Sequence, residues 1–207
     1  MKIQKPHLYH ELTPKTVISI DDVNQNIRFD QQTFCDEDYS HTAFDSVVFY
    51  QCSFEHINFS HCDMMDCRFE KCTFSNCQFD ASSLRRIEFI GCRQSGLSFY
   101  QSSIKDFIFL ECLLSYADFS LSQLKNGSFQ YCVAFNASFY HLSIQQCEFR
   151  QNDLSQCDFN ETPLKGIDLT SNQIHGARLS LNLLKGAILS MEQAMAVVKS
   201  QGIIVKE

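Results

Sequence analysis

The sequence predicts an all-β solenoid, a chain wound into a four-sided coil of short strands, and two repeating patterns predict it. Large apolar residues recur every five positions from Phe29 to Leu189, and small residues, mainly cysteine, alanine and serine, recur two positions before many of them. A period of five fits neither the 3.6-residue period of a helix nor the two-residue period of a simple strand. It fits a coil that turns a corner every five residues, so that four sides close one coil of 20 residues.

The first pattern contains 33 positions in steps of five, and its phase never slips. Seventeen of the 19 phenylalanines lie on it, and Phe107 and Phe135 are the exceptions. Gln94 is the one polar residue at these positions, and it marks either a local break or a buried hydrogen bond. Because an insertion of five residues would preserve the phase, a short loop hidden near residues 92–98 stays an alternative.

Residues 20 apart are expected to lie directly above one another in neighbouring coils, about 4.8 Å apart. Two opposed sides then stack phenylalanine, while the other two sides more often carry Leu, Ile or Met beyond residue 80. Large residues on two sides and smaller ones between them fill a narrow interior at native density. The predicted core ladders are Phe49, Phe69, Phe89, Phe109, Phe129 and Phe149 on one side, and Phe59, Phe79, Phe99, Phe119, Phe139 and Phe159 on the opposite side.

The small-residue pattern holds ten of the 11 cysteines, and Cys35 is the exception. Alanine and serine share these positions, so we interpret the cysteines as small apolar fillers. The alternative is a redox or metal sensor, because stacked thiols would be close enough for disulfides or zinc. The chain has no C-x-x-C motif, and the sequence predicts no metal site and no cofactor.

The segments outside the repeat are expected to cap the solenoid, because open ends expose unpaired strand edges and core. The sequence predicts three parts: an irregular cap or lead-in at 1–26, the β-helix at 27–190, and a capping helix with an apolar tail at 191–207. Ser190 and Gln193 have the spacing of a capping box, which marks a helix start. The apolar residues that follow at one-face spacing are Met191, Ala194, Met195 and Val198.

The five-residue unit resembles the pentapeptide repeat, A-(D/N)-L/F-x-x. Residues 72–76, 77–81 and 117–121 read Cys-Thr-Phe-Ser-Asn, Cys-Gln-Phe-Asp-Ala and Ala-Asp-Phe-Ser-Leu. The resemblance covers residues 27–190, which is most of the chain. It implies a right-handed quadrilateral β-helix of about eight coils, here followed by a short C-terminal α-helix.

The C-terminal stretches 189–194 and 202–205 look like the tail of the topoisomerase-protecting pentapeptide proteins. These include the Qnr-type quinolone-resistance proteins, the mycobacterial gyrase-binding protein and immunity proteins against microcin and albicidin. The resemblance implies a DNA mimic that binds DNA gyrase, with topoisomerase IV as a further target, and protects it from quinolones or a peptide toxin. It also implies a homodimer joined through the C-terminus, by Met191, Ala194, Met195, Val198, Ile203 and Val205. Many Qnr-type proteins carry projecting loops, and the unbroken phase argues against long ones here.

The charge distribution bears on this mechanism. The chain has 17 basic and 24 acidic residues, a net charge of −7, which argues against direct binding of nucleic acid. Residues 29–80 hold 10 acidic and 2 basic residues, over a length on which B-DNA carries about 7 charges. An acidic surface that maintains solubility is the equally weighted alternative. The candidate partner-binding residues are Asp30, Asp36, Glu37, Asp38, Asp45, Glu55, Asp63, Asp66, Glu70 and Asp80.

The sequence predicts no enzyme, because it contains no P-loop, G-x-G-x-x-G or H-E-x-x-H motif. No window of about 18 apolar residues predicts a membrane span, and no signal peptide follows Met1. We therefore expect a cytoplasmic protein with reduced thiols. The alternative function is a non-catalytic scaffold or regulator that binds another cytosolic protein.

Overall fold

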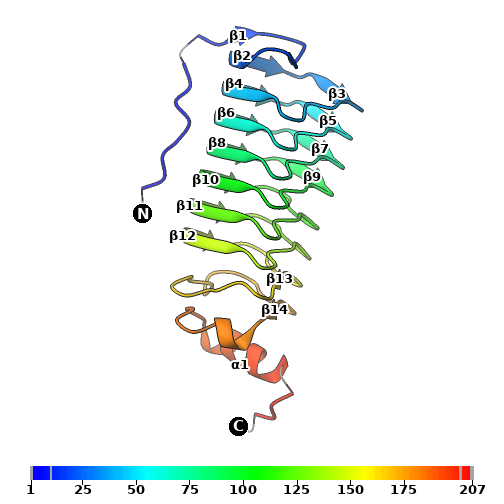
Figure 1. The fold of residues 1–207 in the computed structure, drawn as a ribbon. Coiled ribbons are helices and arrows are strands. Elements are labelled where there is room, and N and C mark those ends of the chain that lie inside the picture. The colour runs from blue at the N-terminus through cyan, green and yellow to red at the C-terminus, as the bar shows by residue number, and fades with distance from the viewer. Residues whose placement is uncertain (1, 10, 201, 206–207) are drawn as a thin grey trace.

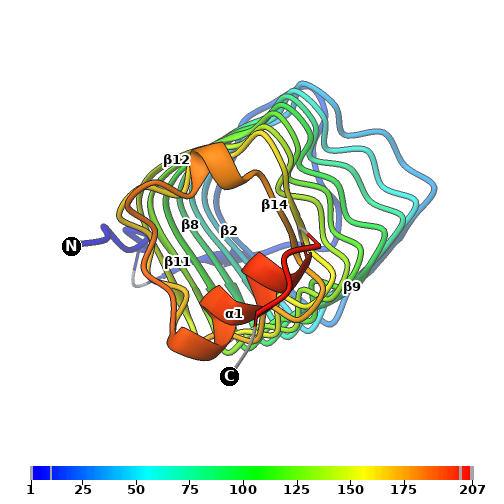
Figure 2. The same ribbon diagram turned by 90° about the horizontal axis from the view of Figure 1, so that it is seen from below.

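The chain winds into a rod whose successive coils lie 20 residues apart (Figure 1). The computed structural model describes residues 2–9, 11–200 and 202–205. Phe49 pairs with Phe69, and Phe69 with Phe89, in one continuous parallel register. Seen along the rod axis, the coils have a four-sided outline (Figure 2). The prediction of a quadrilateral β-helix of about eight coils with a short C-terminal helix is confirmed.

One wall of the rod is an eight-stranded parallel sheet, formed by β1 (Thr13–Pro14), β2 (Asn24–Asp30), β4 (Ala43–Tyr50), β6 (Asp63–Glu70), β8 (Ser83–Ile90), β10 (Ser103–Leu110), β11 (Gln123–Gln130) and β12 (Ser143–Arg150). A four-stranded sheet contains β3 (Thr33–Cys35), β5 (Ser53–Glu55), β7 (Thr73–Ser75) and β9 (Arg93–Ser95). A pair of short strands, β13 (Asp158–Phe159) and β14 (Arg178–Leu179), lies near the C-terminal end. Isolated bridges such as that between Asn58 and Gln78 continue the stacking elsewhere.

We number the four faces on one coil, and every residue 20 positions away shares the face. Residues 47–50 form face 1, 52–55 face 2, 57–60 face 3 and 62–65 face 4. The corners between faces are residues 51, 56, 61 and 66. The long strands of the large sheet wrap the corner between faces 4 and 1, so that Ser46 lies at a bend inside β4.

The corners are built from left-handed backbone. Every fifth residue from Asn26 to Glu161 has a φ angle between 49° and 68°, and only Gly91 and Gly96 among them are glycines. Short polar residues such as Asn and Asp tolerate this conformation better than most L-residues. Each corner is also fixed by the next coil, as where the Gln51 N–H donates to the Glu70 carbonyl at 2.9 Å. The sequence period predicts a corner every five residues, and the structure identifies which residue turns it.

The interior is filled by the two phenylalanine ladders, and all twelve predicted members are buried. Within a ladder the rings stack in parallel, with centroids 4.8 Å apart for Phe89 and Phe109. Across the interior they meet edge to face, as for Phe99 and Phe109 at 5.8 Å and 82°. Both arrangements are favourable for aromatic rings, so the predicted ladders are confirmed as the core.

The small residues between the ladders have a second role that size alone does not explain. The Cys72 Sγ donates to the Phe49 carbonyl at 3.3 Å, and the Ser102 Oγ donates to the Phe79 carbonyl at 2.6 Å. Asn172 makes the equivalent bond through Nδ2 to the Phe149 carbonyl at 2.9 Å. Where a short side-chain donor occupies this position, it satisfies a buried carbonyl, and a buried carbonyl without a partner is costly. This explains why Cys, Ser, Thr and Asn replace one another there.

Gln94 continues the β-helix and does not mark an inserted loop. It pairs with Phe74 in the register of β7 and β9, which runs through residues 93–95. The corners on either side, Gly91 and Gly96, keep the left-handed backbone of the other coils. The Gln94 Nε2 is buried and has no hydrogen-bond partner among the described residues.

The N-terminal segment is divided between two places. Strand β1 pairs with β2 and covers the first coil. Residues 2–9, which we call the strap, run along the outside of the rod beside the large sheet (Figure 1). Four hydrogen bonds hold the strap at the corner between faces 4 and 1: His7 N–H to Asp66 Oδ1 (2.8 Å), Ser46 Oγ to the His7 carbonyl (3.3 Å), Gln4 N–H to Asp106 Oδ1 (3.3 Å) and Asn126 Nδ2 to the Lys2 carbonyl (3.1 Å).

The C-terminal end of the rod is covered by η1 (Leu181–Leu183) and by helix α1 (Met191–Ser200), which crosses the last coil (Figure 2). The predicted capping box is confirmed: Gln193 N–H donates to Ser190 Oγ at 3.2 Å, and Ser190 N–H donates to Gln193 Oε1 at 2.9 Å. Gln193 also donates from Nε2 to two carbonyls of the coil beneath, at 2.8 Å each. Gln193 and Val197 are the buried residues of the helix, so they form its contact with the coil.

Candidate partner-binding surface

The acidic residues singled out in the sequence surround the first coils and do not gather on one face. Asp30 and Glu70 belong to face 1, and Asp45 and Asp63 belong to face 4. Asp66 turns the corner between these two faces. The other five lie on faces 2 and 3 and on the corner between them: Asp36, Glu37, Asp38, Glu55 and Asp80.

Three of the ten carboxylates are paired with arginines that lie just outside residues 29–80. Asp30 contacts Arg28 at 2.8 Å, and Asp63 contacts Arg85 at 3.5 Å. Asp66 is bound by Arg86 through two hydrogen bonds of 2.7 and 2.6 Å. The local excess of negative charge is therefore smaller than the sequence count implies, and it is weakest on faces 1 and 4.

Asp66 is a structural carboxylate and does not face a partner. Its side chain is buried beneath the strap. Burial opposes ionisation of the carboxyl group, but the hydrogen bonds from Arg86 and from the His7 N–H outweigh it and lower the pKa. Asp66 therefore stays charged while it ties the strap to the corner.

The five acidic residues on faces 2 and 3, which we call the acidic patch, make no ion pair with Lys or Arg in the part of the chain that the structure describes. Asp36 contacts His56 at 3.1 Å, and Glu37 accepts a hydrogen bond from Tyr39 Oη at 2.6 Å. The Ser40 N–H donates to Asp38 at 2.9 Å and lowers the pKa of that carboxyl. These contacts orient the carboxylates and leave their charge available to a basic partner.

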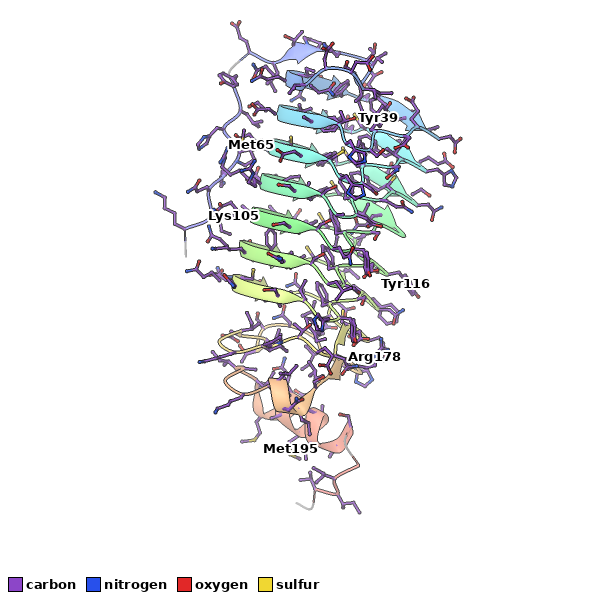
Figure 3. All side chains as sticks on the ribbon, in the orientation of Figure 1. Tyr39, Met65, Lys105, Tyr116, Arg178 and Met195 are labelled. Carbon is purple, nitrogen blue, oxygen red and sulfur yellow. The ribbon has the colours of Figure 1, made fainter. Side chains whose placement is uncertain are left out.

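A second surface on the same side of the rod was not predicted. An exposed apolar patch, which we call the aromatic patch for its three rings, lies on face 2 and its two corners. It consists of Leu113, Tyr116, Tyr131, Val133 and Phe135. Tyr116 is 61% exposed, and its ring meets that of Phe135 edge to face at 6.1 Å. In Figure 3 Tyr116 points away from the rod, on the side opposite Met65 and Lys105. Phe135 is one of the two phenylalanines outside the five-residue pattern, and this was the one signal in the sequence that could have indicated the patch.

The acidic patch and the aromatic patch follow one another along the rod. The Asp80 carboxylate accepts hydrogen bonds from the Ser98 Oγ at 2.5 Å and from the Tyr100 N–H at 3.0 Å. Tyr100 is exposed on face 3, one coil beyond Asp80. Exposed aromatic residues are enriched at protein–protein interfaces, so faces 2 and 3 form the best candidate for a partner contact.

The predicted dimerisation residues lie on the outer side of the C-terminal end. Met191 is 86% exposed, Ala194 is exposed, and Met195 and Val198 are half-buried. In the tail, Ile203 is exposed and Val205 is half-buried. The helix therefore uses Gln193 and Val197 to close the coil, and the apolar residues singled out in the sequence remain accessible. The sequence indicated the cap but not this division between two helix faces.

The described residues hold no group of three or more His, Cys, Asp or Glu side chains placed to bind a metal ion. All 11 cysteines are free thiols, and ten of them are buried. Burial raises the pKa of Cys62, Cys67 and Cys157 to about 12, so these thiols stay protonated and act as donors. Within the same residues, no helix is long and apolar enough to cross a membrane.

Comparisons with known proteins agree with this architecture. A profile described as a pentapeptide repeat region matches residues 62–134, and a profile of pentapeptide repeats in eight copies matches residues 135–170. Together they cover more than half of the chain. No curated protein sequence matches it.

Among solved structures, two trypsin-treated variants of QnrB1, a plasmid-mediated fluoroquinolone resistance protein, have a similar fold. The first is 22% identical with a TM-score of 0.55, and the match covers 89% of this chain and 97% of that one. The second is 24% identical with a TM-score of 0.55, and the match covers 86% and 90%. At this identity the likeness concerns the fold. With the unbroken five-residue register and the matching profiles, the chain belongs to the pentapeptide repeat family.

Proposed function

We propose that this protein is a non-catalytic DNA mimic that binds DNA gyrase, with topoisomerase IV as a further target, and protects it from quinolones or from a peptide toxin. The observation that carries the proposal is the acidic patch, five carboxylates without Lys or Arg partners in the described chain, fixed on a rigid rod. The fold shared with QnrB1, a fluoroquinolone resistance protein, supports the direction of the proposal.

The rod supplies the geometry that such mimicry requires. Coils repeat every 4.8–5.0 Å along the stacked rings, so eight coils extend about 40 Å. The carboxylates are attached to this regular frame at or within two residues of a corner, so the backbone holds their attachment points in a fixed arrangement. The negative charge of the acidic patch attracts the basic surface that normally holds DNA. No bond is made or broken in this function.

The first test is gyrase supercoiling, titrated with the purified protein in the presence and absence of ciprofloxacin. The proposal expects inhibition without drug, or fewer cleaved complexes with drug. No effect on either reaction at concentrations in the tens of micromolar would reject gyrase as the partner.

Charge reversal separates mimicry from a merely soluble surface. The variant Asp36→Lys with Glu55→Lys changes two exposed members of the acidic patch. The matched control is Glu111→Lys with Glu161→Lys, which changes the same charge at two exposed corners outside the patch. We expect the first pair to weaken gyrase binding at least tenfold and to reduce its salt dependence. An equal loss in the control would indicate a general effect of net charge.

The aromatic patch favours a second candidate function, a scaffold or regulator that binds another cytosolic protein. DNA has no comparable exposed apolar surface, so imitation of DNA does not account for this patch. Tyr116→Ser with Phe135→Ser tests it, since both side chains are exposed and can be replaced without opening the core. If capture of a partner depends on these two residues and not on Asp36 and Glu55, the scaffold function replaces the mimic.

The proposal includes a cytoplasmic homodimer joined at the C-terminal end. The exposure of Met191 and Ile203 supports it, because apolar side chains at the end of a rod favour burial against a second copy. Met191→Glu should shift the protein from dimer to monomer in analytical ultracentrifugation and leave the unfolding midpoint of the coil unchanged. A wild-type protein that sediments as a monomer at all concentrations contradicts this part of the proposal.

A further inference from the structure

Face 4 carries a row of cations that the net charge of the chain conceals. Arg85, Lys105 and Lys125 occupy the same position in three consecutive strands of the large sheet, and the register pairs Arg85 with Lys105 and Lys105 with Lys125. All three side chains are exposed. Two more lysines, Lys165 and Lys185, recur at the same position further along the sequence.

This arrangement works against the stability of the sheet. Like charges directly opposite each other on neighbouring strands repel. The coil spacing, 4.8 Å between Phe89 and Phe109 and 5.0 Å between Phe109 and Phe129, brings the three positions about one strand separation apart. Arg85 has a weak acidic partner, Asp63 at 3.5 Å, and no ion pair involves Lys105 or Lys125 within the described ranges. A row of like charges that the fold does not neutralise attracts an external anion.

The strap enlarges the row. The Lys2 carbonyl is bound by Asn126, the neighbour of Lys125 in sequence, and the Gln4 N–H is bound by Asp106, the neighbour of Lys105. The strap therefore carries Lys2 and Lys5 along the edge of face 4, and Figure 3 shows Lys105 on this side of the rod. We call Lys2, Lys5, Arg85, Lys105 and Lys125 the basic row.

The carboxylates nearest the basic row are Asp63, which pairs with Arg85, and two buried carboxylates at the corner, Asp66 and Asp106. Asp66 is held by Arg86 and the strap. Asp106 is buried and accepts hydrogen bonds from Gln4 and Asn126. The acidic patch lies on faces 2 and 3, across the rod. An anion beside Lys105 and Lys125 therefore meets their exposed charges with Asp106 buried behind them, while Asp45 and Asp63 lie on earlier coils of face 4.

We propose that the basic row binds the phosphodiester backbone of a nucleic acid. Arg85, Lys105 and Lys125 stand in one line on the sheet face, with Lys2 and Lys5 beside them on the strap, and this arrangement suits a linear polymer with regularly spaced phosphates. A small anion would reach only one or two of them. Lysine and arginine contacts to phosphates carry no sequence information, so binding is expected to be independent of sequence and strongly dependent on salt. The inference goes beyond the proposed function, since it requires no topoisomerase.

The test measures fluorescence anisotropy of a labelled duplex of about 20 base pairs, titrated with the full-length protein at about 50 mM salt and then at rising salt. The basic-row variant is Lys105→Gln with Lys125→Gln. The matched control, Lys71→Gln with Arg93→Gln, removes two cations from face 2 and its corner with face 1. The unfolding midpoint in urea is recorded for both.

We expect the wild type to bind and the control to bind equally. The basic-row variant should bind at least tenfold more weakly. The magnitude of the slope of log affinity against log salt should decrease by about 2. Its unfolding midpoint should be unchanged or higher, because the repulsion between Lys105 and Lys125 is removed. A residue needed only for folding would lower the midpoint.

Three outcomes would overturn the inference: no binding of duplex or of single-stranded DNA by the wild type, an equal loss in the control, or tighter binding of polyglutamate or of phosphatidylserine vesicles than of DNA. The last outcome would assign the basic row to an acidic protein or a membrane surface. Tighter binding of single-stranded DNA than of duplex supports the inference and identifies the form of nucleic acid. Gyrase is absent from this experiment, so a failure to bind DNA would leave the proposed function standing. A protein without effect on gyrase would likewise leave the inference about the basic row standing.

Discussion

The ring of Phe107 occupies the space above Gly127, its register partner in the next coil. A Cβ atom built on Gly127 would lie 2.2 Å from two atoms of that ring. Phe107 is buried, although its register partners in the two neighbouring coils, Ile87 and Gly127, are smaller. It contacts Phe109 and Phe129 of the ladder, with centroids 5.9 and 5.4 Å apart. The glycine and the oversized neighbour therefore compensate each other.

Gly127→Ala is expected to destabilise the protein by at least about 1–3 kcal/mol, the usual cost of overpacking a core. The Phe107 ring is confined by Phe109 and Phe129 and has little room to move. Urea unfolding, followed by circular dichroism, gives the free energy. In the Phe107→Ala background the same substitution should cost much less, and a double-mutant cycle measures the coupling. Additive effects would mean that the two residues do not compete for space.

Phe109→Ala should destabilise the protein by about 3–5 kcal/mol, as for other buried aromatic residues. Its ring stacks on Phe89 and Phe129 and meets two rings of the opposite ladder edge to face. The control is Phe135→Ala, because Phe135 is 38% exposed and outside the ladders, and it should cost less than about 1 kcal/mol. Similar losses at the two positions in urea titration would contradict the register.

Asp66→Asn should lower stability at neutral pH by about 2 kcal/mol, the usual contribution of hydrogen bonds to a charged group. The pKa of Asp66 is lower in the folded than in the unfolded state. Its contribution is therefore complete above the unfolded pKa and is lost as pH falls through the folded pKa. Urea titrations at neutral and strongly acidic pH should show the difference between wild type and variant shrinking with pH. Asp30→Asn, at an exposed pair, serves as control and should change little.

The thiols should differ sharply in reactivity. Cys35 is exposed and the other ten are buried, so a thiol reagent should label one residue in the native protein and all 11 after unfolding. Desolvation and the Glu55 carboxylate raise the pKa of Cys35, so its labelling should accelerate as pH rises. Mass spectrometry counts the labels. Rapid native labelling of several cysteines would support the sensor that the sequence left open.

Cys112→Ser should change stability by less than about 1 kcal/mol, since serine makes the same carbonyl bond at the equivalent position of Ser102. Cys112→Val should cost more, because valine is larger and leaves the Phe89 carbonyl without its donor. Urea unfolding compares the two variants. Equal stability of serine and valine would show that size alone governs this position.

The candidate site was predicted less completely than the fold. Counting charges along residues 29–80 identified the acidic residues but placed Asp66 among the partner-binding residues, whereas the structure buries it under the strap. Arg85 and Arg86 lie outside that window and pair with Asp63 and Asp66 inside it. The aromatic patch and the basic row were not predicted, because their members are far apart in the sequence and come together only in the coiled structure. Each residue is unremarkable in its own stretch of sequence.

By itself, the sequence determined the coil: a five-residue period with large apolar residues, mostly Phe, at its centre buries these side chains when the chain winds into stacked four-sided turns. Each five-residue repeat specifies the same turn and contacts only its neighbours, so all repeats favour the same coil. Only the tertiary structure decided which outward residues share a face and where residues 2–9 lie. The strap is held by Asp66, Asp106 and Asn126, from three different coils. A contact across 124 positions, such as Lys2 with Asn126, depends on the completed rod and leaves no period in the sequence.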